Sequence, residues 1–427
     1  MRFMICSTGL CYFPFMLNRR NLLAWGACLC STPAVGREYR LGSSSMRQRI
    51  KQDIQSWDAI ADHRTGTEGA SRTSAWLAAE VSDCGFEPKI DWFPFKRRVL
   101  RECFVEVGKH RADHAEGVPL FDGGYTDEVG VSGVLGSLVS QAVIGLTEFS
   151  PTPRANAALE AARQNSKFAA IIAVARGEGV RPGLSLLNAD AYLNPYGPPV
   201  LQVATKHRDW LQTARDDGTR VKLVAHVTLD ATRASNVQVT IPGSNEALAP
   251  LVIMTPLSAW WTCTSERAGG ITIWLEFIRF FAANKPDRNL IFTANTGHEL
   301  GHVGLDHYLV QHPTLIRDAH AWIHLGANFA AKNGRIRFQA SNDRLQAQGL
   351  GALENQNIAI ADVTPLGQRP YGEARNIYDG DGQYISLLGG NSLFHHPDDR
   401  WPEAVDLDKT LQVTKAMLDV VIQLARA

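Results

Sequence analysis

The sequence predicts an α/β protein: a mostly parallel mixed sheet flanked by helices, with a smaller β/α domain inserted into the chain. Two observations support this expectation. After Pro242-Gly243, short apolar strands alternate with long amphipathic helices, a pattern typical of helices packed on a largely parallel sheet. Between residues 117 and 230 the chain changes to a compact run of short strands and helices, which we interpret as an insertion. The larger domain then comprises residues 46–116 and 231–427.

The elements of the larger domain can be located in order. Apolar residues at helical spacing predict a first helix over 46–60, and HRTGTEG at 63–69 is a glycine-punctuated turn before a second helix over 71–81. The stretch 86–95 is expected to be a strand with an aromatic edge. After the insertion the pattern predicts strands at 236–241, 251–254, 289–293 and 320–325, a long helix through Ile271, Trp274, Leu275, Ile278 and Phe281, and a closing helix through Leu411, Met417, Val420 and Leu424.

The insertion has its own expected elements. Strands at 129–139 and 168–174 flank a helix at 156–165, and Pro198-Pro199 precedes a strand–helix–strand unit over 200–227. No internal repeat or low-complexity tract occurs, which argues against a solenoid or a disordered scaffold.

Composition excludes several classes of partner. The 427 residues are 45% hydrophobic and carry 43 basic against 43 acidic side chains, so charge gives no reason to expect nucleic acid as a partner. Beyond the N-terminus no apolar run is long enough for a membrane anchor.

Residues 1–36 have the features of an export signal. Arg19-Arg20 precedes an apolar stretch at 22–30, and Ala34-Val35-Gly36 fits a small-residue cleavage site. This pattern resembles a twin-arginine signal, whose pathway carries folded proteins, and predicts a periplasmic or secreted protein. A buried N-terminal helix is the alternative.

Three cysteines lie outside this segment. Cys84 and Cys103 could form a disulfide in an oxidising compartment or remain two buried thiols, and Cys263 is left over.

The stretch 288–305, RNLIFTANTGHELGHVGL, is the main candidate for chemistry. It predicts a strand followed by a turn and a helix, and functional groups collect at such junctions in α/β sheets. Taken alone, His298-Glu299-Leu300-Gly301-His302 is an H-E-x-x-H string, which on a continuous helix would place two imidazoles beside a catalytic glutamate. Gly301 and Gly304 interrupt that helix, so a surface position for His302 is the competing interpretation.

The order of motifs resembles the zinc-dependent aminopeptidases of the bacterial leucyl aminopeptidase type, which share a fold with glutaminyl cyclases and with the inactive relatives nicastrin and transferrin receptor. The resemblance rests on HRTGTEG, on the insertion closed by Asn236-Val237 and 241–244, and on the HHPDD segment at 395–399. It implies an exopeptidase-like core, a protease-associated type of insertion, and hydrolysis of amide or peptide bonds in a small substrate.

The resemblance also implies a pair of zinc ions, but several ligand positions differ. Glu299 stands at a ligand position, His395 at the final one, and His298 replaces the general base. The first histidine and its neighbouring aspartate are replaced by 255–258, where Pro256 cannot bind a metal; Ser265 replaces the bridging aspartate, and the second aspartate falls at about Gly326, near His324. Because zinc needs about four ligands, we expect at most one ion, held by Glu299, His395 and either His298 or Glu266.

A site without metal is a second interpretation. Cys263 or Ser265 would be the nucleophile, with His298 as base oriented by Glu299. Against it, Cys263 is equally expected as a packed thiol and Ser265 as a helix cap.

Five further residues are candidates for substrate binding. Trp260 and Trp261 could form an aromatic wall or simply pack, and Arg267, Glu373 and Arg375 could grip a charged end of a substrate or form ion pairs. The favoured function is therefore an exopeptidase-like hydrolase with a divergent site, and the alternative is a catalytically silent binding or scaffold protein on the same fold.

Overall fold

In the computed structural model, the residues that can be described are 45–108, 114–152, 155–165, 167–176 and 181–426. The described residues belong to one compact unit. The predicted export signal at 1–36 lies outside the described residues.

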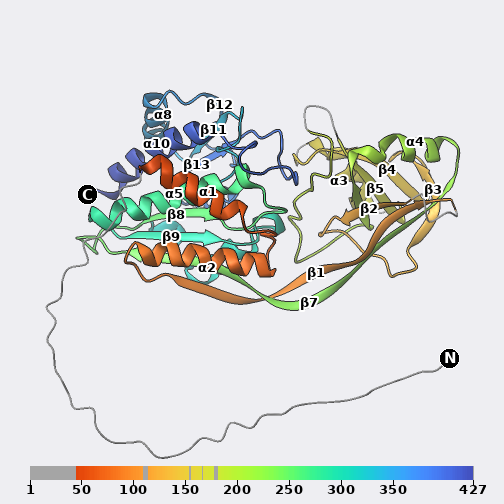
Figure 1. Ribbon diagram of the computed structural model, residues 1–427, viewed down its shortest axis with the longest axis horizontal. Coiled ribbons are helices and arrows are strands. Elements are labelled where there is room, and N and C mark those ends of the chain that lie inside the picture. The colour runs from red at the N-terminus through yellow and green to blue at the C-terminus, as the bar shows by residue number, and fades with distance from the viewer. Residues whose placement is uncertain (1–44, 109–113, 153–154, 166, 177–180, 427) are drawn as a thin grey trace, which may run out of the picture. The chain divides into compact units, whose positions relative to one another are not determined.

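The core of the larger domain is a mixed sheet with a parallel centre (Figure 1). Parallel pairing joins the neighbouring strands β9, β8, β10 and β13, and the edge strands β11 and β12 are parallel to each other. The strand β7 pairs antiparallel with β9, and β11 pairs antiparallel with β13. The bounds are β7 (Arg220–Ile241), β8 (Leu251–Pro256), β9 (Leu290–Asn295), β10 (Ala321–Leu325), β11 (Ile336–Ala340), β12 (Ile360–Val363) and β13 (Tyr384–Gly389).

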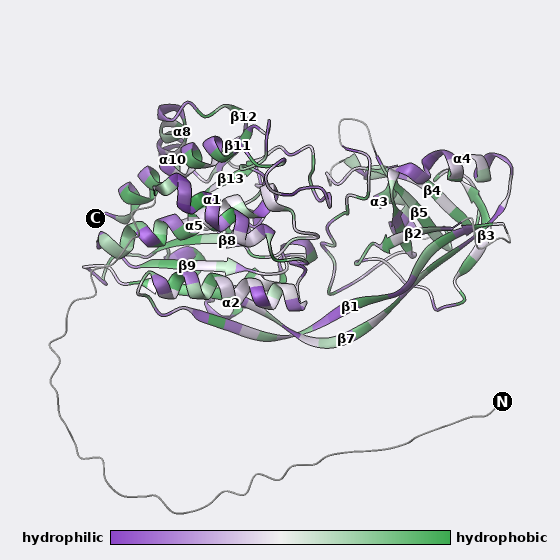
Figure 2. Ribbon diagram, viewed as in Figure 1, coloured by the Kyte–Doolittle hydropathy of each residue, from purple (hydrophilic) through white to green (hydrophobic). Residues whose placement is uncertain are grey.

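Helices cover both faces of this sheet because its central strands are apolar throughout. In β8 all six residues are buried, and Figure 2 colours this strand green. Leu251 and Ile253 pack on one face, against α1 (Met46–Asp58), α2 (Glu68–Asp83), α5 (Thr264–Ala283), α8 (Asp343–Asn355) and α10 (Leu407–Ala425). Val252 and Met254 pack on the other, against α6 (Val303–Gln311), α7 (Leu315–Asp318) and α9 (Ala374–Asp379).

Two long strands connect the core to the inserted module. The strand β1 (Lys89–Val107) pairs antiparallel with β7 along nearly its whole length, from Lys89 opposite Gln238 to Val107 opposite Val221. Their far ends join β2 (His114–Pro119), β3 (Val131–Gly136), β4 (Ile144–Phe149), β5 (Ala170–Ala175) and β6 (Val200–Val203), which are accompanied by α3 (Ala157–Asn165) and α4 (Arg208–Asp216). This module has apolar clusters of its own.

Most predicted elements occur, and the differences have identifiable physical causes. The strand expected at 86–95 extends to Val107 because β7 offers it a partner throughout. The second helix begins at Glu68, since the Thr67 hydroxyl caps it by accepting a hydrogen bond from the Ala70 N–H. The helix expected to start at His298 is instead a 3₁₀ turn, His298–Leu300, followed by α6.

Cys84, Cys103 and Cys263 are free thiols. Within the part of the chain that the structure describes, no helix is both long and apolar enough to cross a bilayer.

The turn HRTGTEG packs against the end of α1. The His63 ring stacks on Trp57 with centroids 3.8 Å apart, and its two nitrogens contact the Thr73 hydroxyl and the Trp57 carbonyl. Gly69 is required here because a Cβ would lie 2.1 Å from the Ala61 carbonyl oxygen. Burial lowers the pKa of His63 to about 4, so the folded protein holds this ring neutral.

We expect His63 to make the protein acid-sensitive. The folded pKa lies below the unfolded value of 6.5, so its contribution is complete above pH 6.5 and is lost as the pH falls towards 4. The loss is about 3 kcal/mol at 1.4 kcal/mol per pKa unit. Urea denaturation of the wild type and of His63→Asn at several pH values measures it. Parallel pH profiles for the two proteins would contradict the prediction.

Candidate functional site

The candidate site lies where the parallel strands β8, β9 and β10 end. Their carboxyl ends are aligned, with Pro256 opposite Asn295 and Met254 opposite His324. Loops that leave these ends therefore converge, as is usual in α/β sheets. The first turn of α5, the residue Glu373 before α9, and the segment around His395 complete the site.

Arg267 is at the centre of the site. One terminal nitrogen, Nη2, lies 2.7 Å from Glu299 Oε1 and 2.9 Å from Glu266 Oε1, and Nε donates to the Ser258 carbonyl at 2.8 Å. All these side chains are buried, and that of Arg267 has no exposed surface. A single guanidinium thus joins two carboxylates inside the protein.

Ser258 fixes the turn that carries Glu299. Its hydroxyl donates to Glu299 Oε2 at 2.6 Å and accepts from the Gly297 and His298 N–H groups at 2.8 and 3.2 Å. The turn needs glycine at 297 and 301, because both have positive φ, near +75°. Both oxygens of Glu299 are therefore engaged, one by Arg267 and one by Ser258.

The neighbours of Glu266 determine its charge. Burial alone would raise the pKa of Glu266, but the Arg267 charge and His395 outweigh it and lower that pKa to about 2. Glu266 is the residue of the first turn of α5 that faces His395, with Oε1 3.4 Å from His395 Nε2. The other ring nitrogen of His395, Nδ1, donates to the Leu186 carbonyl at 2.6 Å.

A second group, on the other side of the turn, contains His298, Glu373 and His324. His298 Nδ1 lies 3.5 Å from Glu373 Oε1, and His324 Nε2 lies 3.9 Å from Glu373 Oε2. These four atoms are buried without a hydrogen-bond partner among the described residues. Buried polar atoms are usually paired, so this concentration of atoms without partners makes the group a candidate site.

Burial controls protonation in this second group. It raises the pKa of Glu373 to about 8 and lowers that of His324 to about 3. For His298, burial together with the nearby charge of Arg267 holds the pKa well below its usual value. At neutral pH the three groups are thus mainly uncharged.

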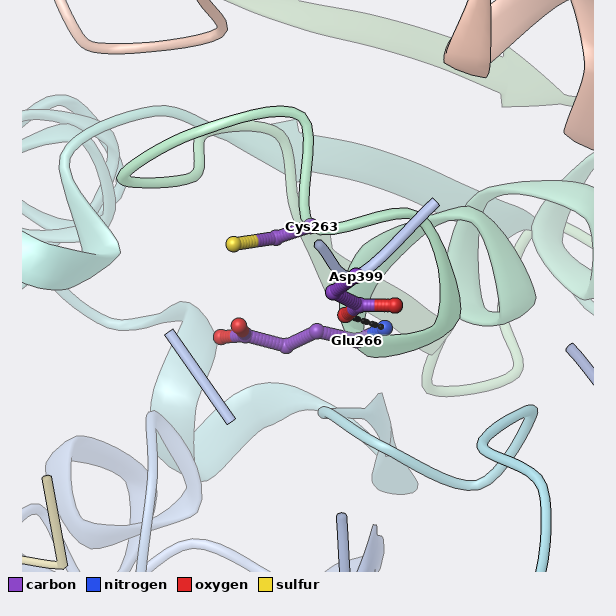
Figure 3. A group of neighbouring side chains, drawn as sticks. All are labelled: Cys263, Glu266 and Asp399. Atoms are coloured by element: carbon purple, nitrogen blue, oxygen red, sulfur yellow. Dashed lines mark hydrogen bonds between the residues drawn. The ribbon is translucent and has the colours of Figure 1, made fainter. Parts of the chain in front are cut away.

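Cys263, Glu266 and Asp399 form a third group, shown in Figure 3. Their ligand atoms lie within 4.8 Å of one another, but Asp399 is already occupied: it accepts hydrogen bonds from the N–H groups of Ser265 and Glu266 at 2.9 and 3.1 Å. In Figure 3 its carboxylate turns to the helix backbone, while the sulfur and the Glu266 carboxylate lie together on the other side. Asp399 therefore caps α5.

The structure does not bring the proposed nucleophiles to His298. Ser265 is buried and its hydroxyl accepts from Asn391 at 3.1 Å. Burial and the neighbouring carboxylates of Glu266 and Asp399 raise the pKa of the Cys263 thiol well above its usual value, so it is a poor nucleophile at neutral pH. No hydrogen bond in the described part of the chain joins His298 to either residue.

The H-E-x-x-H string does not form a zinc-binding helix. Gly301 and His302 both have positive φ, so the helix begins only after His302. The rings of His298 and His302 stack with centroids 5.0 Å apart, and His302 Nδ1 is bonded to Asn376 Oδ1 at 2.7 Å. His302 is buried, so its expected surface position is wrong.

A segment of the insertion, residues 183–192, covers the site. Its Leu186 carbonyl accepts from His395, its Ala189 N–H donates to the Glu299 carbonyl at 2.8 Å, and Asn188 accepts from Trp260 Nε1 at 3.1 Å. Arg375 forms an ion pair with Asp190 at 3.2 Å and is partly exposed. Arg375 thus pairs with this segment, while its charge still acts on His298 and Glu373.

The two tryptophans have different roles. Trp260 is buried and lines a pocket next to Glu299, together with Arg97 and Arg98 of β1. Trp261 donates to the His395 carbonyl at 3.0 Å and packs on the core. Arg97 and Arg98 are not among the residues predicted from the sequence, although the basic run Lys96-Arg97-Arg98 directly after an aromatic strand is a visible signal.

A pair of zinc ions does not fit these residues. The Arg267 guanidinium already contacts Glu299 and Glu266, and Glu266 in turn contacts His395. Gly326 stands at about the position of the second aspartate ligand. A Cβ on Gly326 would lie 2.8 Å from the His324 ring, so a ligand side chain cannot be added beside that histidine. The predicted ligand set of Glu299, His395 and His298 is likewise divided, because Glu299 bonds Arg267 and Ser258 while His298 faces Glu373.

Comparison of the sequence with protein-family models and with curated proteins found no match. Solved structures do resemble it. An aminopeptidase from Aneurinibacillus sp. strain AM-1 matches with a TM-score of 0.65 at 15% identity, covering 89% of this chain and 94% of that one. A zinc aminopeptidase from Bacillus subtilis matches with a TM-score of 0.68 at 14% identity, over 89% and 94% of the two chains.

A third structure is a peptidase M28 precursor from Shewanella amazonensis, with a TM-score of 0.66 at 14% identity over 90% of this chain and 97% of that chain. All three likenesses cover about nine tenths of the chain. Identities this low establish the fold alone, and they confirm the predicted α/β fold with a mixed sheet flanked by helices; the protease-associated type of the insertion stays a prediction. The chain therefore has the fold of the zinc aminopeptidases.

Proposed function

We propose that this protein binds a small ligand on an aminopeptidase fold and that Arg267 has taken the place of the metal pair. The observation that carries the proposal is the contact of one buried nitrogen, Arg267 Nη2, with both Glu299 and Glu266. A guanidinium supplies a fixed positive charge at this point but offers no bound water for hydrolysis.

Two features of the surroundings support the proposal. The candidate nucleophiles Cys263 and Ser265 are buried and engaged elsewhere, and segment 183–192 covers the centre. A pocket remains next to Glu299, so a ligand can approach the site without reaching the buried groups.

The test is zinc binding combined with an aminopeptidase assay. We expect that zinc in slight excess fails to raise the melting temperature of the wild type, and that leucine p-nitroanilide is not cleaved with or without zinc. Arg267→Ala serves as the comparison, because it frees Glu266, Glu299 and His395 for a metal. Two equivalents of tightly bound zinc in the wild type, with zinc-dependent cleavage, would overturn the proposal.

A second candidate is a hydrolase with one zinc, and the unpartnered atoms of His298, Glu373 and His324 favour it. Two histidines and a glutamate form a ligand set used by catalytic zinc, which supplies an activated water when bound. His324 is oriented by the Ser386 hydroxyl at 2.8 Å, and Ser386 accepts from Gln339 at 2.9 Å. One equivalent of zinc in the wild type, lost in Glu373→Gln but retained in Glu299→Gln, would select this candidate.

A further inference from the structure

The pocket next to Glu299 is lined mainly by basic and aromatic side chains. The empty space between its walls is about 400 Å³ when the open solvent at its mouth is included. Its walls come from five parts of the chain: the turn HRTGTEG, the strand β1, the insertion, the loop after β8 and the turn after β9. Three arginines and three aromatic side chains line it: Arg64, Arg97, Arg98, Phe121, Tyr192 and Trp260.

The arginines of the pocket differ in how far their charge is already balanced. Arg64 is neutralised locally, since its Nε and Nη2 bond the two oxygens of Asp62 at 2.7 and 3.0 Å. The charge of Arg97 also acts on the Asp62 carboxylate, but neither Arg97 nor Arg98 forms an ion pair with a carboxylate of its own among the described residues. The guanidinium of Arg98 lies over the Tyr192 ring at 4.0 Å, a cation–π contact that orients the guanidinium without supplying a balancing negative charge.

The one carboxylate on the pocket wall does not cancel these charges. Glu299 is held by Arg267 at 2.7 Å and by the Ser258 hydroxyl at 2.6 Å. The pocket therefore keeps a surplus of positive charge from Arg97 and Arg98. A guanidinium recognises a carboxylate through paired, charge-assisted hydrogen bonds, which are the strongest hydrogen bonds available to a small ligand.

The aromatic side of the pocket indicates the rest of the ligand. Phe121 and Trp260 pack together with ring centroids 5.5 Å apart, and Leu300 and Ala259 extend this apolar surface. Trp260 Nε1 is held by Asn188, so the indole presents its ring rather than its N–H to the pocket. A flat apolar group placed on these rings gains burial and stacking.

We propose that the pocket binds a small carboxylic acid with an aromatic or other flat apolar body, with its carboxylate on Arg97 and Arg98. The inference rests on the proposed function and names the class of ligand. It assigns Arg97 and Arg98 as ligand-binding residues and Trp260 as the wall against which the ligand body packs.

Calorimetric titration with N-benzoylglycine tests this assignment, and its neutral amide, N-benzoylglycinamide, is the matched ligand control. We expect N-benzoylglycine to bind at least about 10-fold more tightly than the amide, because only the acid can form charge-assisted bonds. The affinity should also fall as salt concentration rises.

Three variants locate the binding. Arg97→Gln and Arg98→Gln are each expected to weaken binding of the acid at least about 10-fold and to leave the weak binding of the amide unchanged. Arg101→Gln is the control, because Arg101 lies on the same strand but is exposed and pairs with Asp230. Equal binding of acid and amide, no binding of either, or an acid affinity that Arg97→Gln and Arg98→Gln leave unchanged would overturn the inference.

The result can be separated from that of the proposed function. Binding of N-benzoylglycine is measured without zinc and without turnover. Cleavage of the ligand to benzoate and glycine on addition of zinc would overturn the proposed function in favour of the single-zinc hydrolase, while the pocket assignment would stand.

Discussion

Replacing Arg267 by alanine is expected to lower the free energy of unfolding by about 3–5 kcal/mol, the largest effect of any substitution in the site. The reason is that Glu266 and Glu299 would remain buried with their shared cation removed. An unpaired buried carboxylate loses its hydration without compensation. Urea denaturation at neutral pH measures the change.

Two further variants make this result interpretable. Arg267→Lys keeps the charge but cannot bond Glu299 and the Ser258 carbonyl at once, so an intermediate loss is expected. Arg101→Ala removes a half-exposed ion pair with Asp230 and should cost less than about 1 kcal/mol. If Arg267→Ala costs no more than Arg101→Ala, Arg267 is not the cation that holds the site.

Zinc should partly restore the stability of Arg267→Ala. In that variant three donors surround the vacated position of Nη2: Glu299 Oε1, Glu266 Oε1 and, beside the latter, His395 Nε2. Three protein ligands are enough for a zinc site with one open position. A zinc-dependent rise in melting temperature in the variant and not in the wild type is the expected pattern, and His395→Ala on the same background should abolish it.

The second large effect concerns Glu373 and pH. Burial raises its folded pKa to about 8 from an ordinary value of 4.5. The folded protein therefore holds this proton more tightly than the unfolded chain, and the stability contribution of Glu373 falls as the pH rises from 4.5 to 8. The slope approaches 1.4 kcal/mol per pH unit, so the total amounts to a few kcal/mol.

Glu373→Gln should remove this slope. The amide stays neutral at every pH, so the variant is expected to become progressively more stable than the wild type between pH 4.5 and 8, measured by denaturation of metal-free protein. Glu354→Gln, on the exposed face of α8, serves as the control and should leave the wild-type slope in place. A constant difference between Glu373→Gln and the wild type over this range would show that Glu373 is ionised when folded.

Much of the architecture could be predicted because it depends on local patterns. The apolar runs at 251–254 and 320–325 are buried strands, and the helix through Ile271 and Trp274 covers one face of the sheet. Where prediction and structure differ, the cause is tertiary. The strand β1 is twice the expected length because β7, more than a hundred residues away in sequence, pairs with it.

The candidate site was predictable only in part. The sequence identified Glu299, His298, Glu373 and Arg267 as candidates, and all four lie in it. It did not indicate that Ser265 turns away to Asn391 while its neighbour Glu266 faces His395. Adjacent residues on a helix differ in direction by about 100°. Which of the two faces the site therefore depends on where α5 begins, and Asp399 caps that end of the helix.

The sequence by itself determined the class of fold and the order of its elements. It also determined that metal ligands of the resembled family are missing, since Pro256 has no side chain that can bind a metal in any fold. The tertiary structure decided what took their place. Only folding shows that one guanidinium nitrogen meets two carboxylates, and that Arg97 and Arg98 of β1 line one pocket together with Trp260. The physical reason is that hydrophobic periodicity acts over a few residues, whereas a charge acts on whatever the fold places within a few ångströms of it.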